Sequence, residues 1–236
     1  MIDGNDALMV SKTKLFAFLF TELFLYGAIM ISGGLLLRIC EFVSIVFCFL
    51  FAILSGREGS RLIMAGLGCT VAADFCLVIC SPAQQLWGMV FFLAAQTLYA
   101  ILLHSQVKNK SFLILRFMVI LLAVTLTVIV LGKNTDALAL ISLCYYANLI
   151  INIVLAFCSY GKEPLFPIAL VLFLMCDTVI GLQVASGSYL PIRENSFLYR
   201  LIFTDFNLAW FFYLPSQVLI ALCGSGFKAR RKRSMK

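Results

Sequence analysis

The chain of 236 residues is 63% hydrophobic, has a mean hydropathy of +1.04 and contains only 12% charged residues. A soluble domain of this length cannot bury so much apolar side chain, so the composition excludes that class and predicts a polytopic membrane protein. Nine cysteines lie almost entirely within apolar runs and form no CxxC pair. This usage favours small packing side chains over a disulfide framework or a metal site, and no cofactor is expected.

A helix needs about 20 apolar residues to cross the hydrocarbon core of a membrane. Eight stretches meet this requirement: 15–32, 36–55, 62–80, 86–104, 112–131, 137–158, 165–185 and 203–223. We therefore predict an all-α fold, a bundle of eight transmembrane helices over residues 15–223. A short segment, 1–14, precedes the bundle, and a basic tail, 224–236, follows it. Between the first two spans only Ser32, Gly33 and Gly34 are available for a turn.

The positive charges are distributed unevenly between the two sides of this bundle. An even number of spans places both termini on one side. That side carries thirteen Lys and Arg, six of them in the tail, whereas the opposite side carries four. The positive-inside rule then predicts that both termini are cytoplasmic. Basic segments next to a membrane bind anionic headgroups, so we expect the tail to contact membrane lipids and not nucleic acid.

Two aspartates interrupt spans that are otherwise apolar: Asp74 in 62–80 and Asp177 in 165–185. A carboxylate at the bilayer centre costs roughly 2.5–3.5 kcal/mol, and neither span contains a Lys or Arg that would neutralise it. The two spans run parallel, and each aspartate lies about 18 Å from the cytoplasmic end at about 1.5 Å per residue. We predict one shared polar site; the alternative is that each acid is hydrogen-bonded separately within the bundle.

Other polar side chains are predicted at the same depth. Gln96 and Tyr99 are three residues apart on one helical face of the fourth span. Tyr213 and Gln217 are four apart on one face of the last span, with Pro215 between them. Taken singly, each side chain is typical of hydrogen bonding between packed helices. Together with two acids, they predict a substrate-binding pocket.

Four motifs, in order along residues 36–222, resemble the YhhN-type lysoplasmalogenase family. Ala73-Asp74 is similar to a Gly/Ser-Asp element of that family, and Gly88, Phe92, Gln96 and Tyr99 follow its G-x3-F-x3-H-x2-Y helix. The segment 173–177, FLMCD, is similar to its Phe-x-x-Ser-Asp element, and 213–220, YLPSQVLI, to its terminal Tyr-x-x-x-Gln-x-Leu-Ile helix. The chain departs from the pattern at Gln96, where the family has His, because an amide cannot exchange a proton near neutral pH.

The resemblance implies hydrolysis of the vinyl-ether bond of a lysoplasmalogen-type lysophospholipid to a fatty aldehyde and a glycerophospho-headgroup. Asp74 and Asp177 suit this chemistry, which needs one protonated carboxyl as the acid and one carboxylate to stabilise the cation. Two carboxyls in a low-dielectric site cannot both ionise easily, so one of them retains its proton. Which aspartate is the acid stays open, because the pair titrates as a unit.

Two other functional classes fit the same residues. A small-solute or proton-coupled transporter also uses acids within the membrane, and the two aspartates occupy equivalent spans of two four-helix halves. We rank it second because paired Gly or Pro residues do not break any span at the site. A purely structural role ranks third. The single histidine, His104, does not match zinc hydrolases that need several. We expect a bacterial plasma membrane, with the endoplasmic reticulum membrane as the alternative.

Overall fold

The computed structural model describes residues 12–56, 60–107, 111–160, 164–188, 192–193, 195–204 and 206–226. All regular structure in these ranges is helical, and eight helices are long and apolar enough to cross a membrane, which confirms the predicted fold class. The elements are α1 (Lys12–Ile31), α2 (Gly34–Ser55), α3 (Arg61–Asp74), η2 (Phe75–Ile79), α4 (Gln85–Gln106), α5 (Ser111–Leu131), η3 (Gly132–Asn134), α6 (Ala137–Tyr160), α7 (Leu165–Ser188), α8 (Phe197–Ile202) and α9 (Leu208–Gly226). Most of the segment 1–14, most of the tail, and the loop cations at 57, 108, 110 and 162 lie outside the described residues.

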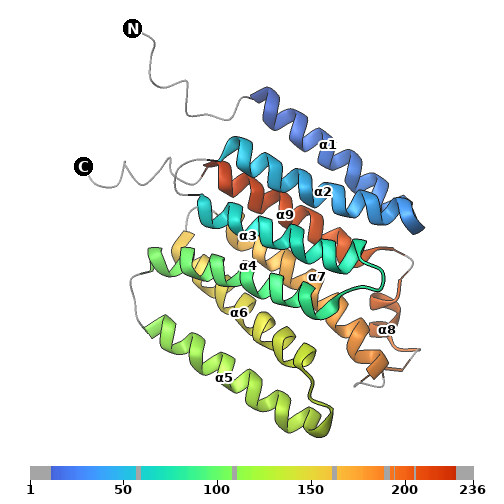
Figure 1. Cartoon of the computed structure of the whole chain (residues 1–236), viewed down its shortest axis with the longest axis vertical. Helices are drawn as coiled ribbons and strands as arrows, with labels where there is room; N and C mark the ends of the chain where they lie inside the picture. Colours follow the sequence, from blue (N-terminus) through green and yellow to red (C-terminus); the bar gives the residue numbers. More distant parts are fainter. Residues whose placement is uncertain are drawn as a thin grey trace.

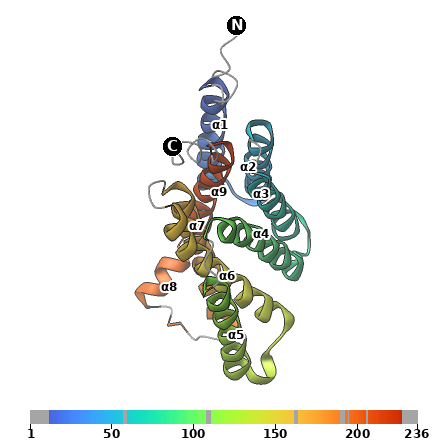
Figure 2. The same cartoon turned by 90° about the vertical axis from the view of Figure 1, so that its left-hand side faces the viewer.

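The long helices lie side by side, and successive spans run in opposite directions (Figure 1). α1 and α5 form the two edges of the bundle, and α1 begins at the end of the bundle where α9 finishes. Seen nearly end-on, α2, α3 and α4 make a second row beside α9, α7 and α6 (Figure 2). The closest helix pairs are α7 with α9, α3 with α4, and α4 with α6. These central helices carry both Asp74 and Asp177.

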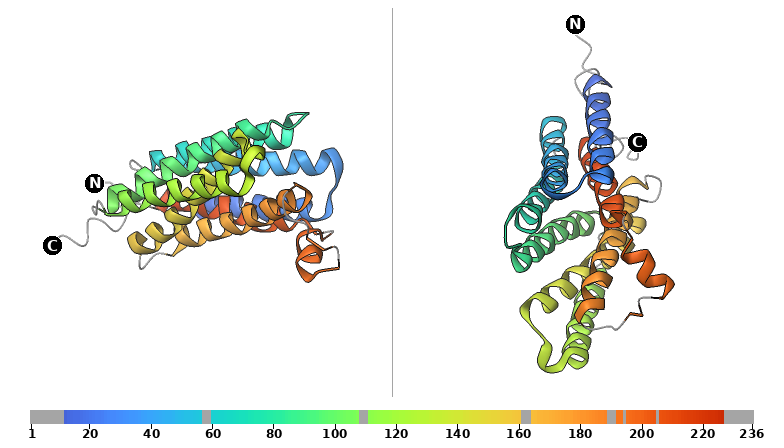
Figure 3. Two further views of the ribbon diagram at one scale, coloured as in Figure 1. Left: turned by 90° about the horizontal axis from the view of Figure 1, so that it is seen from below. Right: turned by 90° about the vertical axis from the view of Figure 1, so that its right-hand side faces the viewer.

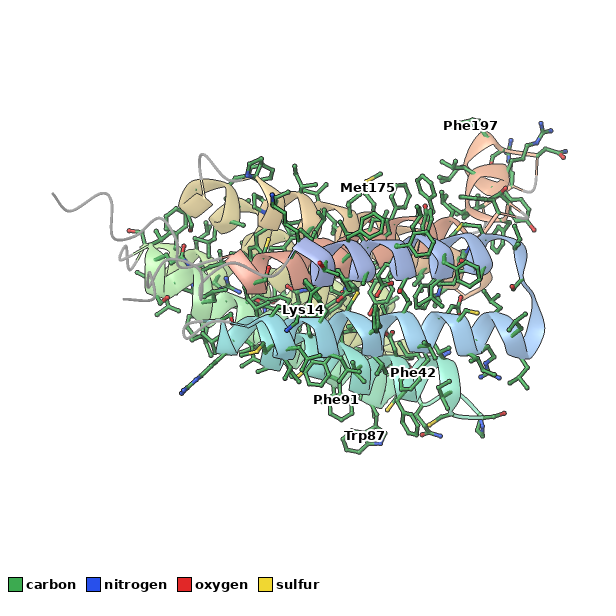
Figure 4. The ribbon with its side chains drawn as sticks, turned by 90° about the horizontal axis from the view of Figure 1, so that it is seen from above. Lys14, Phe42, Trp87, Phe91, Met175 and Phe197 are labelled. Atoms are coloured by element: carbon green, nitrogen blue, oxygen red, sulfur yellow. The ribbon has the colours of Figure 1, made fainter. Side chains whose placement is uncertain are left out.

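Apolar side chains cover the outside of the bundle, as expected for a surface that contacts lipid. Trp87, Met175 and Phe197 project away from the helices (Figure 4) and are 58%, 42% and 81% exposed. α5 is the most apolar span, with a mean hydropathy of 2.8, and only 11% of it is buried in the protein. The span formed by α9 is the least apolar, at 1.5, and 39% of it is buried.

The boundaries of the first two spans follow their turn chemistry. α1 ends at Ile31 and α2 begins at Gly34, so the turn lies where the sequence predicted it. Gly34 has a φ of +61°, a left-handed conformation. Glycine adopts this conformation readily because glycine has no Cβ.

The predicted start of the last span, residue 203, is wrong. α9 begins at Leu208, after the side-chain oxygen of Asn207 accepts a hydrogen bond from the Trp210 amide at 3.4 Å, as an N-cap does. The preceding segment forms the short helix α8, which projects from one end of the bundle (Figure 3). The Gln183 side chain in α7 donates to the Ile202 carbonyl at 2.5 Å and so holds α8 against the bundle.

The third span changes from α-helix to π-helix directly after Asp74. The Cys80 amide donates to the Phe75 carbonyl at 3.0 Å, the i to i−5 bond of a π turn. Arg38 in α2 satisfies carbonyls that this turn leaves open, because its Nε donates to Val78 at 2.6 Å and its Nη2 to Cys80 at 3.3 Å. The end of α3 is therefore fixed by a cation from the neighbouring helix.

Pro215 lies inside α9 without ending it. Proline has no amide hydrogen, so the carbonyl four residues earlier, that of Phe211, loses its usual helical partner. The hydroxyl of Tyr26 in α1 donates to this carbonyl at 3.3 Å. The proline thus creates an acceptor that links the edge helix α1 to α9.

Candidate functional site

The last residue of α3, Asp74, is 3% exposed and faces α9. The hydroxyl of Tyr213, in the second turn of α9, donates to Asp74 Oδ2 at 2.7 Å. A hydrogen bond to a carboxylate inside a bundle is shorter and stronger than one between neutral groups, and it fixes the orientation of the acid. The sequence predicted both residues as part of one site, and the structure brings them into direct contact.

The second aspartate, Asp177, lies in the middle of α7 and is partly buried. Its Oδ2 accepts a hydrogen bond from the hydroxyl of Tyr145 in α6, a side chain that is 2% exposed. The two acids therefore have the same local arrangement, a carboxyl on one helix and a tyrosine hydroxyl on the next. Tyr145 is not among the site residues predicted from the sequence.

One aromatic cluster connects the two aspartate–tyrosine pairs. Phe173, one helical turn before Asp177, has its ring centroid 5.3 Å from Tyr213 and 6.4 Å from Tyr145. Phe92 in α4 contacts the same two tyrosines, at 6.3 and 5.8 Å, and Phe173 at 5.6 Å. The carboxyls of Asp74 and Asp177 are close enough to interact electrostatically. Five helices, α3, α4, α6, α7 and α9, thus contribute to one cluster that joins two acids, two tyrosines and two phenylalanines.

A third carboxyl, Glu41 in α2, lies beside this site. It is 6% exposed and interacts electrostatically with Asp74. The side-chain amide of Asn207 donates to Glu41 Oε1 at 3.1 Å, and the charge of Arg38 acts on the same carboxyl. Glu41 is therefore within electrostatic range of Asp74 and is hydrogen-bonded to the residue that precedes α9.

Gln217 occupies the turn of α9 below Tyr213. The hydroxyl of Thr70, one turn before Asp74 in α3, donates to the Leu67 carbonyl at 2.7 Å, and its oxygen lies 3.5 Å from Gln217 Oε1, the upper limit for a hydrogen bond. Gln217 is fully buried, and its Nε2 has no hydrogen-bond partner among the described residues. This amide therefore lies on the same helix pair as Asp74 and Tyr213, one turn closer to the C-terminal end of α9.

The other two predicted side chains, Gln96 and Tyr99, have different neighbours. The side-chain amide of Asn152 in α6 donates to the Gln96 carbonyl at 2.8 Å and to Gln96 Oε1 at 2.9 Å. Tyr99 packs its ring edge-on against Phe166, with centroids 5.7 Å apart, and closely covers Gly66. Both residues are fully buried, yet their hydrogen bonds and ring contacts do not include either aspartate. Sequence spacing found the correct helix faces but not the partners across the bundle.

A periodic signal for the missed residues was present in the sixth span. Tyr145, Asn148 and Asn152 recur at i, i+3 and i+7, the spacing of one helical face, and all three are at least 95% buried. Within the described part of the chain, His, Cys, Asp and Glu side chains do not form any group of three that could hold a metal ion. The arrangement supplies carboxyls, hydroxyls and amides in an apolar setting, the groups needed for proton transfer.

Residues 35–223 match the YhhN family. The match covers all four motifs described above and every side chain of the two aspartate–tyrosine pairs. No curated protein and no solved structure matches the chain significantly.

Proposed function

The chain belongs to the YhhN family, and from this premise we propose that it is an integral membrane hydrolase of lysoplasmalogens. It cleaves the vinyl-ether bond of a lysophospholipid and releases a fatty aldehyde and a glycerophospho-headgroup. The single observation that carries the proposal is the pair of carboxyls within the bundle, Asp74 and Asp177, each held by a tyrosine hydroxyl at one aromatic cluster.

The reaction needs one proton donor and one anion at the same place. One carboxyl gives its proton to the β-carbon of the vinyl ether, which leaves an oxocarbenium ion at the α-carbon. The other carboxyl, as carboxylate, stabilises this cation and takes a proton from the water that adds to it. When the hemiacetal breaks its bond to the glycerol oxygen, the second carboxyl gives its proton to that oxygen and the first carboxyl takes the hydroxyl proton. One water is consumed, one aldehyde and one alcohol form, and both carboxyls regain their starting states.

The surroundings of the two acids suit a charge that develops during the reaction. Phe92 and Phe173 supply apolar walls, which strengthen the attraction between a carboxylate and an oxocarbenium ion. Tyr145 and Tyr213 hold the carboxyls in place, so little reorganisation is needed when the cation forms. A site within the bundle also suits a substrate whose alkyl chain lies in the membrane.

Purified protein incubated with a lysoplasmalogen should release fatty aldehyde, detected by mass spectrometry. Asp74→Asn and Asp177→Asn should each lower the rate by at least about a hundredfold, because an amide keeps the size and hydrogen bonding but cannot transfer the proton. The double variant should be hardly slower than either single variant, since the two carboxyls act as one unit. All three variants should keep nearly wild-type thermal stability.

Asp136→Asn provides a matched control. Asp136 is exposed at the start of α6, and its Oδ1 accepts from the Ala139 amide at 2.7 Å, a cap that asparagine preserves. This variant should hydrolyse at the wild-type rate. Wild-type aldehyde release by both Asp74→Asn and Asp177→Asn would refute the proposed acids. If the wild-type protein releases no aldehyde but carries protons or a solute into liposomes in an acid-dependent way, the transporter alternative replaces the hydrolase.

A further inference from the structure

Arg116, in the second turn of α5, is a buried cation that the proposed reaction does not use. It is 7% exposed. Its Nε donates to His104 Nε2 in α4 at 3.2 Å, and its Nη2 donates to Asn152 Oδ1 in α6 at 2.8 Å. Its Nη1 has no hydrogen-bond partner among the described residues. Charged side chains inside a membrane span are costly, and they commonly mark a binding site.

Both partners of Arg116 are neutral acceptors. A histidine nitrogen that accepts a hydrogen bond carries no proton, so His104 is neutral and adds no second positive charge beside the guanidinium. The amide nitrogen of Asn152 donates to Gln96, and this turns the Asn152 oxygen toward Arg116. Within the part of the chain that the structure describes, the positive charge of Arg116 is not paired with a carboxylate.

Two buried groups around Asn152 that lack hydrogen-bond partners in the described residues are N–H donors, whereas Asn148 Oδ1, one turn along α6, is an acceptor without a partner. Gln96 Nε2 is buried and, like Arg116 Nη1, lacks a partner in the described residues. Asn152 contacts both side chains, so the two unpartnered donors lie on either side of one asparagine. A buried cation and an amide N–H that both lack acceptors fit an oxyanion, and a guanidinium matches the oxygens of a phosphate well.

A buried polar stripe on α6 connects Arg116 to the proposed reaction centre. Tyr145 holds Asp177 at one end of the stripe, and Asn152 contacts Arg116 at the other, with Asn148 between them. The seven residues from Tyr145 to Asn152 correspond to about 10.5 Å along the helix. In a lysophospholipid, only the glycerol carbons and one oxygen separate the phosphorus from the ether oxygen, a shorter distance, so the side chains of Arg116 and Asp177 must reach toward each other along the stripe.

We propose that Arg116 and Gln96 bind the phosphate of the lysophospholipid while its ether lies between Asp74 and Asp177. This inference rests on the proposed function and names the subsite that recognises the headgroup. Arg116 is five residues into α5, about 7.5 Å from its start. The phosphate therefore lies near the end of the bundle where α5 begins, and the alkyl chain points deeper. The lipid comes from the leaflet at that end.

Binding of two non-cleavable ligands to the full-length protein in an uncharged detergent tests this subsite. One ligand is a saturated 1-O-alkyl glycerophosphoethanolamine, and the other is the matching 1-O-alkylglycerol without phosphate. The wild-type protein should bind the phosphate-bearing ligand at least about tenfold more tightly, the effect of one charge-assisted hydrogen bond. Arg116→Gln should remove this preference and leave the Kd of the alkylglycerol unchanged. Arg116→Lys should keep part of it.

Lys133→Gln is the matched control, because Lys133 is an exposed cation beyond the far end of α5. It should bind both ligands like the wild-type protein. Equal wild-type affinities for the two ligands, or an unchanged preference in Arg116→Gln, would overturn the proposal. Displacement of the alkyl phospholipid by chain-free glycerophosphoethanolamine at similar concentrations would also overturn it, since the ligand would then be a free phosphate ester.

The binding test and the aldehyde assay distinguish failure of the phosphate subsite from failure of the proposed hydrolase. A phosphate preference that depends on Arg116, without aldehyde release by the wild-type protein, supports the subsite and rejects the hydrolase. Aldehyde release with the same KM in Arg116→Gln as in the wild-type protein supports the hydrolase and rejects the subsite.

Discussion

At the scale of single residues, the site consists of two acids that each depend on one tyrosine. Tyr145 and Tyr213 come from helices that neither aspartate belongs to, so each hydrogen bond fixes a carboxyl across a helix–helix interface. A hydroxyl in this position stabilises the carboxylate form and sets its direction. We therefore regard both tyrosines as positioning residues.

Two neighbouring tyrosines on α6 allow this role to be measured. Tyr145 donates to Asp177, whereas the hydroxyl of Tyr146 pairs with that of Thr178 at 2.8 Å on the same two helices. Tyr145→Phe should lower kcat roughly ten- to hundredfold, because a hydrogen bond to a charged group contributes about 1.5–3 kcal/mol. Tyr146→Phe also removes one α6–α7 hydrogen bond, but it should change kcat less than about twofold.

Steady-state aldehyde release, together with thermal unfolding of both variants, checks this prediction. Similar losses of kcat in Tyr145→Phe and Tyr146→Phe would mean that the rate depends on the contact between α6 and α7 and not on the hydrogen bond to the Asp177 carboxyl. A restored rate in Tyr145→Phe at a different pH would instead agree with a changed balance of protonation at Asp177.

The sequence identified the two acids and Tyr213 because a carboxyl in an apolar run is conspicuous, and because Tyr213 belongs to a motif. It did not identify Tyr145, because the polar face that Tyr145 forms with Asn148 and Asn152 contains no charged residue that would distinguish it from ordinary hydrogen bonding between helices. It also assigned Gln96 to the aspartates. The structure shows Gln96 bonded to Asn152, and partners that lie across a bundle cannot be read from spacing along one helix.

At the scale of elements, the junction of α3, η2 and α4 positions Asp74. Gly88 in α4 faces η2 so closely that a Cβ there would lie 2.5 Å from Leu77 Cγ. Leu77 is part of the π turn that begins directly after Asp74. The close approach of these helices thus depends on the absence of a side chain at residue 88.

Gly88→Ala should therefore destabilise the protein by about 1–3 kcal/mol through overpacking, and it should slow aldehyde release by moving the end of α3. Gly181→Ala is the matched control in α7, because a Cβ at Gly181 would meet nothing within 4 Å. It should leave the rate unchanged and stabilise the helix slightly. Thermal unfolding and aldehyde release of both variants test the pair; an unaffected Gly88→Ala would show that η2 adjusts freely.

Element boundaries were predicted less well than element existence. All eight spans were recognised from hydropathy alone, but the start of the last one was placed five residues early. Phe203 and Phe206 extended the apparent span, whereas the Asn207 side chain caps the actual start of α9. The π turn after Asp74 was not predicted either, because it arises from contacts with Arg38 and α4 and not from a local sequence signal.

At the scale of the whole molecule, the even number of spans places the start of α1 and the end of α9 on one side of the membrane. The thirteen-to-four distribution of Lys and Arg predicts that this side is cytoplasmic. A fluorescent protein fused to the C-terminus should therefore fold and fluoresce in the cytoplasm. A cysteine placed at Lys133 should react with an impermeant maleimide added from outside, in a background where the exposed Cys158 is replaced by serine.

A C-terminal fusion located outside the cytoplasm would reverse the orientation of the whole bundle. It would also move the proposed phosphate subsite to the outer leaflet, because Arg116 lies near the end of the bundle where the termini are. The two aspartates would stay together in either orientation.

The contrast between α5 and α9 has a consequence for biosynthesis. α5 is the most apolar span and touches few other helices, so it can leave the translocon and enter lipid by itself. α9 has the lowest hydropathy and carries Pro215, Ser216 and Gln217 in its middle. These polar groups are covered by α7 and α3, as when Ser216 donates to the Ala169 carbonyl at 2.8 Å. Because α9 is synthesised after its partners, its stable integration depends on their earlier assembly, and the contact between Asp74 and Tyr213 is completed only when the last span docks.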